Sequence, residues 1–129
     1  SPMPIFILFF SSIFCPFREG GGSFIYTTVN TFMKIENVDF VINNDGVRHR
    51  VSKFWVKEPE TVTWINTFTN DDIFYDIGAN IGLYSIWAGR KCRTYAFEPQ
   101  AENYALLNAN IKHNNMQDKV TAYCCAIYN

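Results

Sequence analysis

Two carboxylates in this chain are placed where they could bind a nucleoside. Asp76 ends the hydrophobic run that begins at Ile73, and Glu98 follows a second run, Thr94–Phe97. If both runs are parallel strands of an open α/β sheet, both acids lie at the carboxyl ends of strands, where such sheets bind ligands. Their separation is close to the roughly 20 residues at which a carboxylate can reach ribose hydroxyls. The pair therefore predicts a ligand that contains a ribose.

A glycine loop follows Asp76 and predicts close contact between the backbone and this ligand. Gly78 and Gly82 accept positive φ without penalty, and Asn80 is among the few other residues that tolerate left-handed geometry. In the pattern D-x-G-x-x-x-G, Asn80 replaces the second glycine of the dinucleotide fingerprint, and no G-K-[ST] ending of a triphosphate-binding loop follows. These features favour a nucleoside without a phosphate chain, carrying a positive amino group that Asp76 could neutralise. S-adenosylmethionine fits this description.

Pro99 holds Glu98 in an extended conformation, because proline disfavours the α region for the residue before it. A carboxylate aimed beyond the end of the strand can accept two ribose hydroxyls. An alternative is that the acids are simply exposed at strand ends and that the glycines serve only the turn. On the first interpretation, the expected cofactor-binding residues are Asp76, Gly78, Ala79, Asn80, Gly82 and Glu98.

The composition is that of one packed domain. The chain has 129 residues, of which 48% are hydrophobic and 18% charged, with a formal net charge of −1. A nucleic-acid surface would normally need a concentrated positive stripe, and the Lys and Arg residues are scattered, so nucleic acid is not an expected partner. The cysteines lack metal-site spacing, which predicts no metal centre and reduced thiols in a cytoplasmic protein. They are Cys15, Cys92, Cys124 and Cys125.

The first 30 residues read as a leader of uncertain status that is poorly ordered. The apolar run from Ile5 to Phe14 is shorter than the roughly 20 residues of a membrane-spanning helix, and no basic segment precedes it as in a secretory signal. A membrane partner is therefore not expected. The segment Gly20–Ser23 then predicts a flexible break before the folded part, residues 31–129.

The remaining elements alternate in a way that predicts a parallel sheet. A hairpin is expected over residues 38–51, with its turn at Asn43–Gly46, followed by a helix over about 59–68. From Ile73 onward, strands alternate with helices, which indicates right-handed crossovers. The expected segments are a helix at 83–88, a strand at 94–97, a helix at about 101–114 and a strand at 120–127. This is an α/β, Rossmann-like half, residues 73–127, of an incomplete domain.

The segments Asp76–Gly82 and Phe97–Pro99, at this separation, resemble the FkbM-type methyltransferases, and the likeness extends over about residues 48–127. The resemblance implies a class I, Rossmann-like methyltransferase fold, of which residues 31–129 would be the N-terminal part. It implies transfer of a methyl group from S-adenosylmethionine to a hydroxyl of a small molecule or glycan. It further implies that the residues from Asp76 to Gly82 line the methionine side and that Glu98 holds the ribose. No catalytic base can be assigned.

Two other functions stay open at this stage. A truncated or degenerate module could bind a nucleoside without transferring a methyl group. A nicotinamide-dependent oxidoreductase is disfavoured, because Asn80 stands where the dehydrogenase glycine lets the backbone approach the pyrophosphate.

Overall fold

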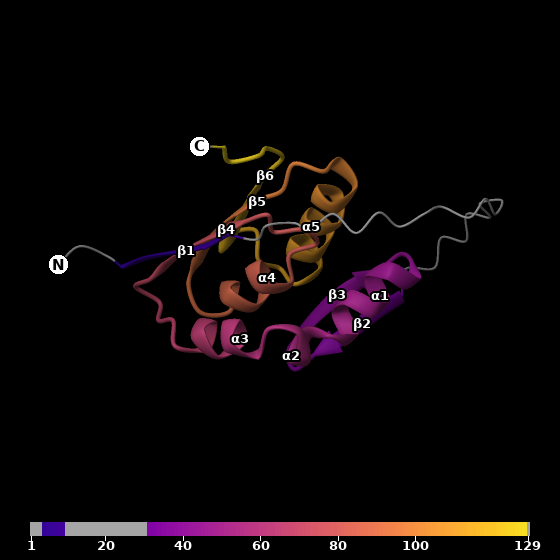
Figure 1. Ribbon diagram of the computed structural model, residues 1–129, viewed down its shortest axis with the longest axis horizontal. Coiled ribbons are helices and arrows are strands. Elements are labelled where there is room, and N and C mark those ends of the chain that lie inside the picture. Colours follow the sequence, from indigo (N-terminus) through magenta and orange to yellow (C-terminus); the bar gives the residue numbers. More distant parts are fainter. Residues whose placement is uncertain (1–3, 10–30, 129) are drawn as a thin grey trace.

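The computed structural model describes residues 4–9 and 31–128 (Figure 1). Its main element is a four-stranded sheet in the order β1-β4-β5-β6, in which every neighbouring pair is parallel. The predicted α/β class with a parallel sheet is therefore confirmed at this level. The strands are β1 (Ile5–Phe9), β4 (Ile73–Ile77), β5 (Arg93–Phe97) and β6 (Val120–Tyr123).

Helices α3 (Pro59–Asn66), α4 (Leu83–Gly89) and α5 (Ala101–His113) pack on one side of this sheet (Figure 1). Alternate residues of each strand point into this layer, so Phe74 and Ala96 are fully buried while Tyr75 and Tyr95 on the opposite face are partly exposed. Trp87 of α4 is one of the largest fully buried side chains and donates its indole N–H to Asn66 Oδ1 at 2.8 Å.

A second, antiparallel sheet pairs β2 (Thr31–Ile35) with β3 (Val38–Ile42), and two short helices follow, α1 (Asp45–Ser52) and α2 (Phe54–Lys57). The hairpin predicted over residues 38–51 is therefore wrong in its second half, which is helical.

Helix α1 begins at Asp45, inside the predicted turn, because Asn44 is its N-cap and its side chain accepts a hydrogen bond from the Val47 amide at 2.9 Å. Val47 and Val51, the two buried residues of α1, are four positions apart. That spacing suits one face of a helix as well as one face of a strand, so the alternation was ambiguous.

The leader prediction is also corrected, because residues 5–9 form the edge strand β1 beside β4. Phe6 and Leu8 pack against the core, and the Phe6 ring stacks on Phe68 at 4.6 Å. Ile5 and Ile7, on the other face, are 58% and 49% exposed. An unbroken apolar run carries no periodicity that could reveal such a strand. Cys15 and the break at 20–23 lie outside the described residues.

The other boundaries differ little from those predicted: the helix expected over 59–68 ends at Asn66, and the one expected over 101–114 ends at His113. The last strand is shorter than predicted and ends at Tyr123. None of the helices in the described ranges combines the length and hydrophobicity needed to cross a bilayer.

Candidate functional site

The carboxyl ends of β4 and β5 meet at one edge of the sheet, as the spacing of the two acids predicts. Ile77 pairs with Phe97 in the parallel register, so Asp76 is one residue from the end of its strand and Glu98 directly follows the other. The negative charge of Glu98 is close enough to contribute to raising the pKa of Asp76. The structure thus brings the two predicted carboxylates together.

Three left-handed residues shape the loop between β4 and α4. Gly78, Asn80 and Gly82 have φ values of 81°, 56° and 90°, which are the conformations that glycine and asparagine were expected to supply. The amides of Gly78 and Ala79 both donate to the Phe97 carbonyl at 2.9 Å, and this ties the loop to the end of β5.

Glu98 holds this loop from the side. Its side chain is 4% exposed, its Oε2 accepts the Asn80 amide at 2.7 Å and its Oε1 accepts the Gln100 amide at 2.9 Å. The carboxylate therefore faces the loop as well as the end of the sheet, a backbone-fixing role that the sequence did not indicate. Each carboxylate oxygen has two acceptor sites, so one site on each remains for ribose hydroxyls.

Asp76 is buried and only half satisfied. It is 1% exposed, its Oδ2 accepts the Ser85 hydroxyl at 2.5 Å, and its Oδ1, also buried, has no hydrogen-bond partner in the described part of the chain. Burial raises the pKa of this carboxyl from 3.8 to about 6; the Ser85 hydrogen bond opposes that rise and the charge of Glu98 adds to it. A buried acceptor without a donor is costly, so this oxygen fits a positively charged N–H group such as the amino group of S-adenosylmethionine.

Two side chains that the sequence did not single out complete the loop's surroundings. Ser85 lies in the first turn of α4 and donates its hydroxyl to Asp76 Oδ2. Arg50 of α1 donates from Nη1 to Asn80 Oδ1. Arg50 was missed because residues 47–51 were assigned to a strand. Ser85 carried no signal of its own, since a lone serine in a helix is usually unremarkable.

Comparison with known proteins gives a partial match. No protein-family model matches the chain, so the resemblance to the FkbM-type methyltransferases is not confirmed. The chain is 34% identical over 61 residues to a tRNA (guanine(37)-N(1))-methyltransferase of Coprinopsis cinerea. The match covers 46% of this chain and 13% of that relative, so this chain corresponds to a small part of its length.

Two solved structures have the same fold over about three quarters of the chain. One is P. horikoshii TYW2 in complex with MeSAdo, with a TM-score of 0.58 and 20% identity, covering 75% of this chain and 36% of that one. The other is M. jannaschii tRNA m1G37 methyltransferase, with a TM-score of 0.58 and 19% identity, covering 74% and 30%. The expected enzyme class and the expected cofactor, S-adenosylmethionine, agree with these relatives.

The prediction about partners is wrong. Nucleic acid was excluded on charge, yet the curated relative and one of the structural neighbours are tRNA methyltransferases by name. Net charge was a poor guide, because the charge of this chain describes a region that corresponds to only 13% of that relative. A small-molecule or glycan hydroxyl as the methyl acceptor has no support from these comparisons.

Proposed function

We propose that this protein is an S-adenosylmethionine-dependent methyltransferase that modifies tRNA, and that the β4–α4 loop with Glu98 is its cofactor site. The observation that carries the proposal is the buried Asp76 Oδ1, which has no hydrogen-bond partner within the described residues and lies two residues before the left-handed loop. The similarity to methyltransferases in sequence and in fold supports the same class of enzyme.

Each residue has a role that follows from its contacts. Asp76 Oδ1 accepts a hydrogen bond from the amino group of the cofactor. Glu98 accepts hydrogen bonds from the ribose hydroxyls, while its other acceptor sites hold the amides of Asn80 and Gln100. Gly78 and Gly82 let the main chain approach the methionine part, with Ala79 and Asn80 between them. The cofactor, when bound, supplies a methyl group already activated by its sulfonium centre.

This assignment makes residues 31–128 part of a class I, Rossmann-like methyltransferase domain. The parallel order of β4, β5 and β6, each joined to the next through a helix, supports it. The strand β1 lies on the far side of β4, so β4 is an interior strand of the described sheet, and the β4–α4 loop lies at the carboxyl ends of the strands, outside which such sheets bind ligands.

For the acceptor, we propose a guanine base of tRNA. The support is the 34% identity to a tRNA (guanine(37)-N(1))-methyltransferase, together with the fold shared with a tRNA m1G37 methyltransferase. Methyl transfer to a guanine ring nitrogen forms an N–C bond while the S–C bond of the cofactor breaks, and the proton on that nitrogen is released to solvent. In-line alignment of the two reactants can lower the barrier by about 7–11 kcal/mol.

Two measurements test the two parts of the proposal. Isothermal titration of S-adenosylhomocysteine and of NADH tests the cofactor, and binding of NADH without binding of S-adenosylhomocysteine would contradict it. Transfer of labelled methyl from S-adenosylmethionine to tRNA transcripts tests the acceptor. We expect label in transcripts with guanine at position 37 and not in matched transcripts with adenine there; equal labelling of both would refute a guanine acceptor.

A further inference from the structure

We infer that Asn110 is a positioning residue that holds the β4–α4 loop in the form that binds the cofactor; the inference rests on the proposed function of that loop. Asn110 lies on α5 and is fully buried, with no exposed surface. Its Nδ2 donates to the Ile81 carbonyl at 2.7 Å, and its Oδ1 accepts the Val41 amide at 2.8 Å. One side chain therefore joins the loop to the hairpin strand β3.

The bond to Ile81 falls at the most demanding point of the loop. Ile81 lies between the two left-handed residues Asn80 and Gly82, and its own side chain is fully buried. The Asn110 amide gives the Ile81 carbonyl a buried donor, and leaving a buried carbonyl unpaired is unfavourable. Asn110 thus stabilises the orientation of the peptide between Ile81 and Gly82.

The same face of α5 also limits the space beside the loop. A Cβ atom on Gly82 would lie 2.5 Å from Leu107 Cδ1, and Leu107 is fully buried one turn before Asn110. The backbone at Gly82 is therefore in close contact with α5. Packing at Gly82 and the hydrogen bond to Ile81 together make α5 a template for the second half of the loop.

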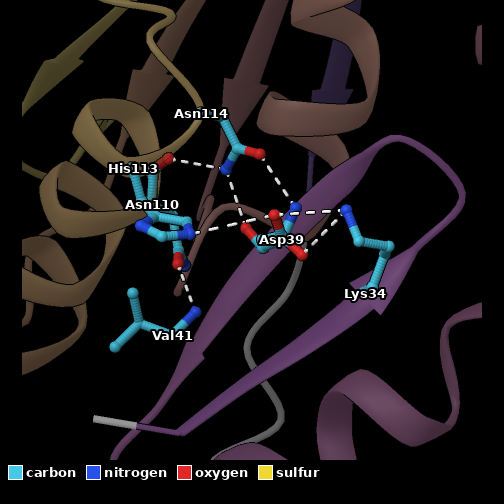
Figure 2. Close-up of polar contacts among 6 residues, drawn as sticks. All are labelled: Lys34, Asp39, Val41, Asn110, His113 and Asn114. Atoms are coloured by element: carbon cyan, nitrogen blue, oxygen red, sulfur yellow. Dashed lines mark hydrogen bonds and ion pairs between the residues drawn. The ribbon is translucent and has the colours of Figure 1, made fainter.

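The C-cap of α5, Asn114, supplies a natural control. Asn114 accepts the Asp39 amide at 2.8 Å and donates to the Asp39 carbonyl at 2.7 Å and to the Asn110 carbonyl at 2.8 Å. Figure 2 shows Asn110 of α5 and its C-cap Asn114 reaching to the same strand of the hairpin, β3. Both asparagines fix the hairpin, and within the described residues only Asn110 of the two is hydrogen-bonded to the loop.

Matched substitutions separate positioning from general stability. Asn110→Asp keeps the acceptor toward Val41 but replaces the donor toward Ile81 with an oxygen that repels the carbonyl. Asn114→Asp makes the same chemical change without touching the loop. We expect Asn110→Asp to raise the Kd for S-adenosylhomocysteine about tenfold, and Asn114→Asp to change it by less than about twofold.

Amide hydrogen exchange gives a second readout that does not need the cofactor. We expect the Asn80 and Gly82 amides to exchange faster in Asn110→Asp and to stay protected in Asn114→Asp. Equal changes in both variants, or no change at these amides, would overturn the inference. If the wild-type chain binds no S-adenosylhomocysteine, the proposed function fails, whereas the exchange result still decides the role of Asn110. If Asn110→Asp does not fold, Asn110→Ser carries the same expectations.

Discussion

Replacing Gly82 by alanine tests whether the loop depends on a left-handed glycine packed against α5. Gly82 has a φ of 90°, a conformation that costs an L-residue about 1–2 kcal/mol. The added Cβ would also lie 2.5 Å from Leu107 Cδ1 in a buried layer, and overpacking of this kind costs about 1–3 kcal/mol. We therefore expect Gly82→Ala to lower the free energy of unfolding by about 2–5 kcal/mol.

Urea unfolding followed by circular dichroism measures this loss, and two further variants divide it into its parts. Gly89→Ala creates similar crowding, 2.6 Å from Val120 Cγ2, at a residue of helix α4 that lies outside the left-handed region. It should therefore cost less than Gly82→Ala, by about the 1–2 kcal/mol of the left-handed backbone. Leu107→Ala removes the clashing methyl group, so the double variant should be more stable than the sum of its single effects by about 1–3 kcal/mol.

The outcome that would refute this reasoning is specific. If Gly82→Ala costs less than about 0.5 kcal/mol, or if its effect adds to that of Leu107→Ala within about 0.5 kcal/mol, then Gly82 is not confined by α5.

Three other changes test the site and the corrected helix. Burial raises the pKa of Asp76 from 3.8 to about 6, so the contribution of this carboxyl to stability is full below pH 3.8 and lost as the pH rises through 6. Urea unfolding from pH 3.5 to 7.5 should therefore show that the wild type loses about 3 kcal/mol of its free energy of unfolding, a loss that Asp76→Asn removes. If the free energy of unfolding changes equally with pH in both proteins, the raised pKa is refuted. Glu98→Ala should weaken binding of S-adenosylhomocysteine by about 1–3 kcal/mol through lost charge-assisted hydrogen bonds, as measured by calorimetry, and unchanged affinity would remove Glu98 from the site. Asn44→Ala should destabilise the fold by about 1 kcal/mol while Asn44→Gly costs only a few tenths, since a glycine cap is tolerated; thermal unfolding that shows no loss for alanine would argue against the cap.

The sequence predicted the elements around the site because their residues allow few alternatives. Glycines and an asparagine at a strand–helix junction, with an acid before them, indicate a left-handed loop at a sheet edge. Pro99 after Glu98 marks the end of the next strand. For this reason β4, α4 and β5 have nearly the predicted bounds.

The failures occurred where one pattern suits two structures. The spacing of Val47 and Val51 suits both a helix and a strand, and the N-cap at Asn44 stabilises the helix. The uniform apolar run at Ile5–Phe9 has no period at all, and it becomes a strand by pairing with β4, 68 residues further along the chain.

The hydrogen bonds that complete the site were also invisible in the sequence, because they join residues that are distant along the chain. Asn110 bonds to Ile81 and to Val41, and Arg50 bonds to Asn80, across separations of about 30 to 70 residues. No local propensity specifies such pairs. The prediction of the partner class failed for a different reason, since it was judged from the net charge and the scattered Lys and Arg residues of this chain.

Proton release on cofactor binding is the most direct test of the claim that Asp76 receives the amino group of S-adenosylmethionine. With a pKa of about 6, the carboxyl is half protonated at pH 6 in the free protein, and pairing with a cation would ionise it. Titration of S-adenosylhomocysteine at pH 6, in two buffers of different ionisation enthalpy, should therefore show release of about half a proton in the wild type and none through this group in Asp76→Asn. Binding of equal affinity and equal proton release in both proteins would contradict the claim.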